Sequence, residues 1–270
     1  MSELPIAREI ERRKPKRLTT SKTETVCRYF GDPQNYLDIR RYIIELRKET
    51  VQEFLVGRSF NRVLDIGCGD GSITVPLLNP QRRLTLLDLS SSMLSRAVSK
   101  IPRELSANVE VINQDFMNTP LSPCSYDLIT CIGVLAHVDS PCEVIAKVAS
   151  LLRPGGFLIL ECTDAAHFSN GLTVLSGWIW RLFSEPRGYR SNLMSADSVT
   201  HMARQQGLHL LESYRHNLAL PTMRRLFGQA TLQRMVRWIF GTASRNRNAW
   251  LGKECLFLFT RDSGNTCVSN

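Results

Sequence analysis

Short apolar runs alternate with helical stretches through the middle of the chain. The runs have the length of buried strands and cover residues 63–66, 84–87, 109–112, 126–132 and 157–160. The helical stretches between them cover residues 72–78, 90–101 and 140–152. Ser90 and Ser140 stand where helix N-caps are expected, because a serine hydroxyl accepts a hydrogen bond from a free N–H of the first turn. This alternation predicts an α/β fold with a doubly wound, mostly parallel sheet.

The pattern differs on either side of this region. Residues 34–57 carry apolar side chains at helical spacing with charges between them, which predicts a long N-terminal helix. Further along, residues 195–206 read as a helix, and residues 208–214 and 254–260 read as a sixth and a seventh strand. Two segments remain, at about 165–192 and about 217–252, and we interpret them as insertions in a domain that spans residues 23–270.

The turn after the first strand is rich in glycine, with Gly67, Gly69 and Gly71 at alternate positions. Glycine permits positive φ and carries no Cβ, so a ligand can lie directly on the backbone. The expected helix N-terminus behind the turn favours an anionic or carboxylate-bearing ligand. The dinucleotide fingerprint requires glycine where Ser72 stands, and no P-loop lysine is present. The turn therefore disfavours a dehydrogenase and a P-loop nucleotide site.

Acidic residues follow the second and the third predicted strands. Asp88 comes 21 residues after Gly67, close to the spacing expected of an acid that binds ribose hydroxyls. A carboxylate at this place accepts two hydrogen bonds from a cis-diol. Asp115 follows the third strand, with Phe116 directly behind it. Asp88 therefore predicts a nucleoside site at the carboxyl ends of the strands.

Asp65 and the three glycines fill the pattern acid-x-Gly-x-Gly-x-Gly, which resembles motif I of the class I S-adenosylmethionine-dependent methyltransferases. The ordered series from Asp65 to the Leu-Arg-Pro-Gly-Gly turn at residues 152–156 is similar to the small-molecule, UbiE-like enzymes of that family. The resemblance implies the strand order 3-2-1-4-5-7-6, with strand 7 antiparallel. It also implies S-adenosyl-L-methionine as the cofactor and S-adenosyl-L-homocysteine as its product.

The same resemblance implies roles for individual residues. The glycine turn would position the methionine moiety, Asp88 the ribose and Asp115 the adenine amino group, while Phe116 would pack on the ring. An ordinary turn or helix cap is the alternative for Asp115. The expected cofactor-binding residues are Asp65, Gly67, Cys68, Gly69, Asp88, Leu89, Met93, Asp115, Phe116 and Cys131.

Candidates for the chemistry itself are fewer. His137 follows the fourth strand, where donor and acceptor meet in this family, and a near-neutral pKa suits a general base for a hydroxyl acceptor. The alternative is a histidine that only shapes the pocket. By the same resemblance Tyr29 and Tyr36 are expected to line the methyl pocket, with ordinary packing as the alternative. No cluster of Asp, His and Asn stands out around the fourth strand, so we expect no metal.

Charge distribution and cysteine content indicate the cellular compartment of the protein. The net charge of +9 is concentrated in residues 1–22 and 181–250, while residues 23–180 carry a small acidic excess. We interpret residues 1–22 as a disordered basic tail. The eight cysteines include no C-x-x-C pair, and no secretory leader is recognisable. These features predict reduced thiols and a cytoplasmic protein.

The two insertions are typical of a lid over the acceptor site in this fold. They combine tryptophans and other apolar residues with most of the arginines of the C-terminal half. Three interpretations stay open: a lid packed on the core with solvated arginines, a lid shaped for a bulky apolar or anionic acceptor, and a basic aromatic surface in weak contact with an anionic membrane.

The favoured function is therefore methylation of a small molecule, on O, N or C, with a bulky lipophilic or natural-product scaffold as acceptor. The absence of a recognisable nucleic-acid appendage disfavours nucleic acid as a partner. An RNA or protein methyltransferase is the alternative, since the basic tail and the arginine-rich insertion suit a macromolecule. A cofactor-binding accessory subunit without catalysis is the second alternative. The oligomeric state is not predicted.

Overall fold

The computed structural model describes residues 33–168, 194–217 and 227–264. The side chains of residues 33–40 are not among those described. The basic tail, Tyr29 and most of the first predicted insertion lie outside these ranges. The predicted domain boundaries stay expectations.

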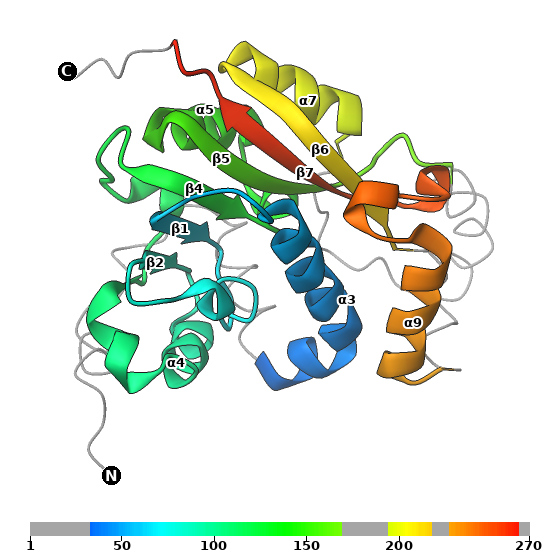
Figure 1. Ribbon diagram of the computed structural model, residues 1–270, viewed down its shortest axis with the longest axis horizontal. Coiled ribbons are helices and arrows are strands. Elements are labelled where there is room, and N and C mark those ends of the chain that lie inside the picture. The colour runs from blue at the N-terminus through cyan, green and yellow to red at the C-terminus, as the bar shows by residue number, and fades with distance from the viewer. Residues whose placement is uncertain (1–32, 169–193, 218–226, 265–270) are drawn as a thin grey trace.

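Seven strands form one sheet in the order β3-β2-β1-β4-β5-β7-β6 (Figure 1). The strands are β1 (Arg62–Ile66), β2 (Arg83–Leu87), β3 (Val109–Ile112), β4 (Tyr126–Cys131), β5 (Leu152–Thr163), β6 (Leu208–His216) and β7 (Glu254–Arg261). The first five pair in parallel, and β7 runs antiparallel to both β5 and β6. The predicted fold and strand order are confirmed.

Five α-helices accompany the sheet in the described part of the chain: α3 (Pro33–Phe54), α4 (Ser91–Ser99), α5 (Pro141–Leu151), α7 (Ala196–Gln205) and α9 (Gln229–Phe240). The predicted serine caps are confirmed, because Ser90 accepts a hydrogen bond from the Met93 N–H and Ser140 accepts one from the Glu143 N–H. Helix α3 agrees with the predicted helix 34–57 within a few residues.

Two local predictions need correction. Residues 72–78 form only the short 3-10 turn η1 (Val75–Leu77) instead of a helix, because Pro76 has no N–H to donate to an i−4 carbonyl. Residues 153–156, expected to form a turn before the fifth strand, lie within β5. There they interrupt the pairing with β4, since Leu152 pairs with Tyr126 and the next pair is Phe157 with Leu128.

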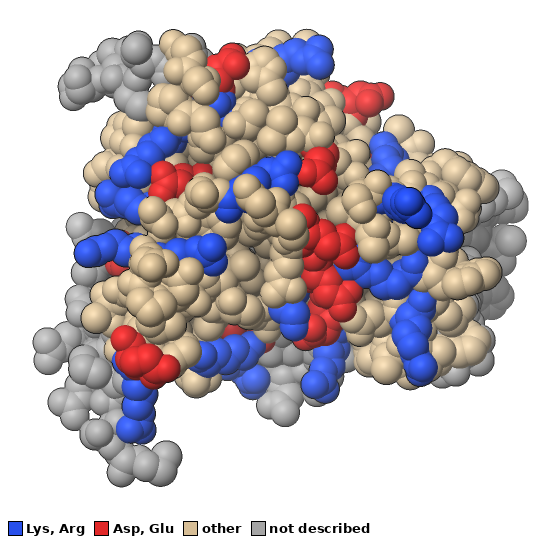
Figure 2. Space-filling view, viewed as in Figure 1, with Lys and Arg blue, Asp and Glu red and all other residues tan. Residues whose placement is uncertain are grey.

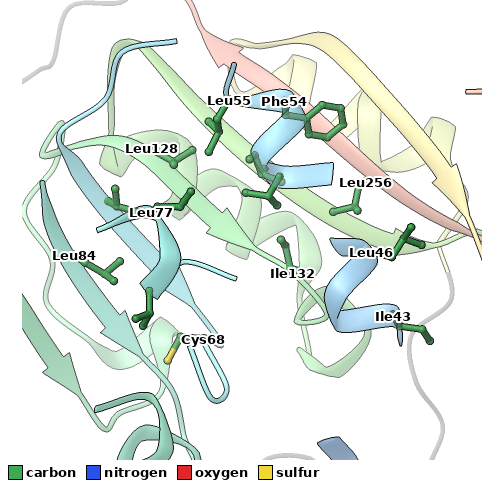
Figure 3. Packing of buried hydrophobic residues seen from close by; sticks show 14 of the residues in the cluster. Ile43, Leu46, Phe54, Leu55, Cys68, Leu77, Leu84, Leu128, Ile132 and Leu256 are labelled. Carbon is green, nitrogen blue, oxygen red and sulfur yellow. The ribbon is translucent and has the colours of Figure 1, made fainter. Parts of the chain in front are cut away.

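Apolar side chains cover both faces of the sheet, as a doubly wound fold requires. One cluster joins the sheet to α3, α4 and α9, and Figure 3 shows part of it, including Ile43, Leu46 and Phe54. The second cluster joins the other face to α5 and α7. Helix α9, from the second predicted insertion, packs on α3 through the Arg237–Glu49 ion pair and an apolar side. The part of that insertion in α9 thus packs on the core.

Candidate functional site

The glycine turn leaves β1 at the edge of the sheet where the parallel strands end. The Gly67 and Cys68 N–H groups both donate to the Leu87 carbonyl, at 2.8 and 3.2 Å, so the turn is bound to the end of β2. Gly67, Gly69 and Gly71 have φ of +66°, +54° and +70°. A Cβ on Gly67 would lie 2.4 Å from Val134 Cγ2, whereas a Cβ on Gly69 would meet no atom of the described residues within 4 Å. The open side of the turn is therefore at Gly69.

Asp88 lies against this open side. Its Oδ2 accepts a hydrogen bond from the Gly69 N–H at 2.8 Å, and its Oδ1 accepts one from the Ser90 N–H at 2.8 Å. Burial raises the pKa of Asp88 above its ordinary value, although these backbone donors oppose the shift. The structure therefore brings together the predicted ribose acid and the predicted glycine turn.

Asn113 fixes the backbone beside Asp88 and was missed by the sequence analysis as a site residue. It is buried directly after β3, and its Nδ2 donates to the carbonyls of Asp88 and Leu89, both at 2.9 Å. One amide thereby holds the segment that carries the predicted ribose acid. A polar residue at the end of an apolar strand is the sequence feature that would have indicated it.

The predicted adenine side of the site lies around η3 (Phe116–Asn118). Asp115 is the N-cap of η3, with its Oδ1 accepting from the Met117 N–H at 2.7 Å, so the capping alternative describes its observed contact. Phe116 is buried, and the Lys147 ammonium lies 4.8 Å from its ring centroid. Lys147 also donates to the Phe116 carbonyl at 2.6 Å. Lys147 therefore supports this turn, a role that the sequence did not indicate.

The other predicted cofactor contacts are divided between the site and the core. Leu89 is half-buried directly after Asp88, and Met93 is buried in the first turn of α4. Cys68 and Cys131 are buried free thiols, and burial raises the pKa of both, so they are protonated at neutral pH. Cys124 is disulfide-bonded, which makes the expectation of reduced thiols wrong at that position.

Asp65 is buried below the turn at the end of β1. Its Oδ2 accepts a hydrogen bond from Thr74 Oγ1 at 2.5 Å, and its Oδ1 accepts one from Thr130 Oγ1 at 2.7 Å. Burial raises the pKa of Asp65 to about 7, against the opposing effect of the two hydroxyl donors. In this structure Asp65 links β1 to β4 and to the turn, and its contact with a cofactor stays a prediction.

Replacing Asp65 with Asn is expected to remove a pH dependence of stability. Because the pKa is raised on folding, the folded state holds a proton that the unfolded state releases above about pH 4. The stabilisation from Asp65 is therefore present at low pH and is lost as the pH rises towards about 7. Between about pH 5 and about pH 7 this loss lowers the free energy of unfolding by about 2–3 kcal/mol. Urea unfolding of wild type and Asp65→Asn at both pH values measures it, and equal slopes in the two proteins would contradict the account.

The segment after β4 lies next to the glycine turn, since Val134 occupies the space beside Gly67. It contains Gly133, with φ of +74°, and the 3-10 turn η4 (Leu135–His137). The His137 N–H donates to the Val134 carbonyl at 2.8 Å, and its side chain is half-buried. His137 is therefore placed on the segment that adjoins the turn. The side chains of Tyr29 and Tyr36 lie outside the described residues.

Comparison with known proteins identifies the family of the chain. Residues 37–213 match the protein family described as "Methyltransferase domain". A ubiquinone biosynthesis O-methyltransferase of Nitrosomonas europaea is 28% identical over 193 residues, which covers 69% of this chain and 80% of that protein. The enzyme of the same name from Burkholderia thailandensis is 27% identical over 153 residues, 56% of this chain and 66% of its own length.

Solved structures show the same fold. Magnesium protoporphyrin IX methyltransferase from Synechocystis, with bound S-adenosylhomocysteine, superposes with a TM-score of 0.61 at 19% identity, covering 90% of this chain and all of that one. The N-methyltransferase NodS from Bradyrhizobium japonicum gives a TM-score of 0.58 at 17% identity, covering 90% and 99%.

The fold and the placement of the glycine turn define a class I S-adenosylmethionine-dependent methyltransferase. The chain belongs to the methyltransferase domain family, whose match covers more than half of its length. S-adenosylmethionine is the cofactor of this class. Among the described residues, no helix has the length and apolar character needed to cross a membrane.

Proposed function

We propose that this protein transfers the methyl group of S-adenosylmethionine to a hydroxyl of a bulky, lipophilic small molecule. The observation that carries the proposal is the contact between Gly69 and Asp88, which joins an open glycine turn to an acid suited to a ribose diol. The names of the relatives support an oxygen acceptor. Methyl transfer depends mainly on holding the two reactants close and aligned, so the acceptor pocket determines which molecule reacts.

The proposed contacts of the donor follow the order of the strands. Gly67 and Gly69 receive the methionine moiety, Asp88 the ribose hydroxyls, and Asp115 with Phe116 the adenine. Support comes from the shared edge of the sheet. The turn donates hydrogen bonds to the Leu87 carbonyl at the end of β2, and Asn113 at the end of β3 donates to the carbonyl of Asp88. The remaining predicted contacts are Asp65, Cys68, Leu89, Met93 and Cys131.

We further propose that His137 is the general base that takes the proton of the acceptor hydroxyl. It lies on the segment after β4 and is half-buried. His137→Gln is expected to lower kcat by about 100-fold, the usual contribution of a positioned base, without changing the affinity for S-adenosylmethionine. Steady-state rates and calorimetric titration measure both quantities. A change confined to KM would indicate that His137 only shapes the pocket.

Weak membrane contact through α9 is a proposal that the surface supports. Trp238 is 81% exposed and lies close in sequence to the exposed Arg234, Arg245 and Arg247. Figure 2 shows Lys and Arg side chains along the part of the surface where α9 lies. Trp238→Ala is expected to reduce flotation with anionic phosphatidylserine vesicles by about 10-fold, since an interfacial tryptophan and basic residues act together. Equal flotation of the variant, or equal binding to neutral phosphatidylcholine vesicles, would contradict this proposal.

The proposed reaction is tested with methyl-labelled S-adenosylmethionine. The purified chain is incubated with a catechol that carries a long alkyl chain, with total RNA and with a protein extract in separate reactions. Label in an ether of the catechol is the expected result. Label only in RNA or protein would favour the macromolecular alternative, and donor binding with no transfer to any acceptor would favour the accessory subunit.

A further inference from the structure

A buried group of polar side chains lies where β5, β6 and β7 run side by side. Glu161 comes from β5, His216 from the end of β6 and Glu254 from the start of β7. One ligand atom from each lies within 4.8 Å of the other two, and all three residues are buried. We name these residues the Glu-His-Glu cluster. It lies beside the segment after β4, because a Cβ on Gly133 would be 3.8 Å from Glu161 Oε2.

His216 is the informative member of this cluster. It is fully buried, and neither ring nitrogen has a hydrogen-bond partner among the described residues. Nε2 lies 3.8 Å from Glu161 Oε1, and Nδ1 lies 3.9 Å from Glu254 Oε2. Burial lowers the pKa of His216 to about 4, so the imidazole is neutral at physiological pH. A buried imidazole without partners is costly, and a neutral one keeps a lone pair that can bind a metal ion.

Arg47 supplies positive charge at the same place. Its Nε donates to Glu161 Oε1 at 2.7 Å, and one Nη lies 2.6 Å from Glu161 Oε2 and 3.8 Å from Glu254 Oε2. With His216 neutral, the four side chains together carry one net negative charge. A guanidinium on two carboxylates stands in the position that a bound cation would take, so Arg47 and a metal ion would compete for the same oxygens.

We propose that Glu161, His216 and Glu254 form a binding site for a divalent first-row transition-metal ion such as Mn²⁺ or Zn²⁺, with Arg47 as the competing cation. Two carboxylates and one imidazole suit these ions, whereas Mg²⁺ and Ca²⁺ prefer sites built entirely of oxygen. The inference concerns metal binding alone and does not depend on the acceptor proposed above.

The first test measures Mn²⁺ binding to the full chain after treatment with a chelator. Mn²⁺ is the probe because the free buried thiols would attract Zn²⁺. Electron paramagnetic resonance of free Mn²⁺ is expected to show one ion bound per chain in the wild type and at least 10-fold weaker binding in His216→Gln. His209→Gln is the matched control, since His209 is also on β6 and also faces a carboxylate, Asp262, but is exposed. No binding to the wild type, or equal binding to His216→Gln, would overturn the proposal.

The second test removes the competing cation. In Arg47→Met the two carboxylates lose a buried guanidinium, so the melting temperature without metal is expected to fall. Added Mn²⁺ is expected to restore it, with at least 10-fold tighter binding than in the wild type. The double variant Arg47→Met/His216→Gln is expected to show no such restoration. If added Mn²⁺ leaves the melting temperature of Arg47→Met unchanged, the proposal is overturned. This outcome can be read even if His216→Gln alone fails to fold.

Discussion

Asp88→Ala is expected to weaken the binding of S-adenosylhomocysteine by about 100-fold or more. The carboxylate already accepts the Gly69 and Ser90 N–H groups, and it has further lone pairs for two ribose hydroxyls. Hydrogen bonds to a charged group contribute about 1.5–3 kcal/mol each, and each 1.4 kcal/mol is a factor of ten. Loss of two such bonds therefore accounts for the expected factor, and calorimetric titration measures it.

Two further variants separate the ribose contact from a general loss of structure. Asp88→Asn keeps the shape and one acceptor oxygen, so we expect an intermediate affinity. Asp262→Asn removes an exposed carboxylate that pairs with His209, far along the chain from the site, and is expected to bind as the wild type does. If Asp88→Ala folds and binds S-adenosylhomocysteine as tightly as Asp262→Asn does, Asp88 does not hold the ribose.

Gly67→Ala is expected mainly to lower stability, and Gly69→Ala is expected mainly to weaken donor binding. Both glycines have positive φ, which costs an alanine about 1–2 kcal/mol. At Gly67 the new Cβ would also overlap Val134 Cγ2, at 2.4 Å, and such overpacking adds about 1–3 kcal/mol. Gly67→Ala is therefore expected to lose about 3 kcal/mol of stability, whereas Gly69→Ala should lose about 1 kcal/mol.

The affinity for the methyl donor also distinguishes Gly69→Ala from Gly67→Ala. The Cβ of Gly69→Ala would point into the open space that we assign to the donor, so the folded variant is expected to bind S-adenosylhomocysteine at least 10-fold more weakly. Urea unfolding and calorimetric titration on both variants provide the comparison. Normal donor binding by Gly69→Ala would mean that the open side of the turn is not the donor site.

The strands and helices around the sheet were predictable because their cause is local and repeated, whereas the strand order followed only from the resemblance to class I methyltransferases. Each apolar run is short and bounded by turn or cap residues, and Ser90 and Ser140 form the predicted caps. The error at residues 72–78 has a local cause too, because apolar spacing indicated a helix while Pro76 removed one of its donors. The register between β4 and β5 depends on how residues 153–156 leave the ladder, which no periodicity reveals.

The geometry of the proposed donor site was predictable in part, because its cause is also a regular one. Gly67, Gly69 and Asp88 stand at the ends of adjacent strands, and parallel strands bring those ends together. Asn113 and Lys147 were missed, because their roles are hydrogen bonds to backbone carbonyls of another element. The Glu-His-Glu cluster could not be predicted from the sequence, since its members meet only when β7 inserts between β5 and β6.

The central claim is that the glycine turn and Asp88 bind a sulfur nucleoside rather than a nicotinamide dinucleotide. Calorimetric titration of the purified chain with S-adenosylhomocysteine and, separately, with NADH tests it most directly. The account predicts saturable binding of one S-adenosylhomocysteine per chain and no heat from NADH. Binding of NADH without binding of S-adenosylhomocysteine would contradict it.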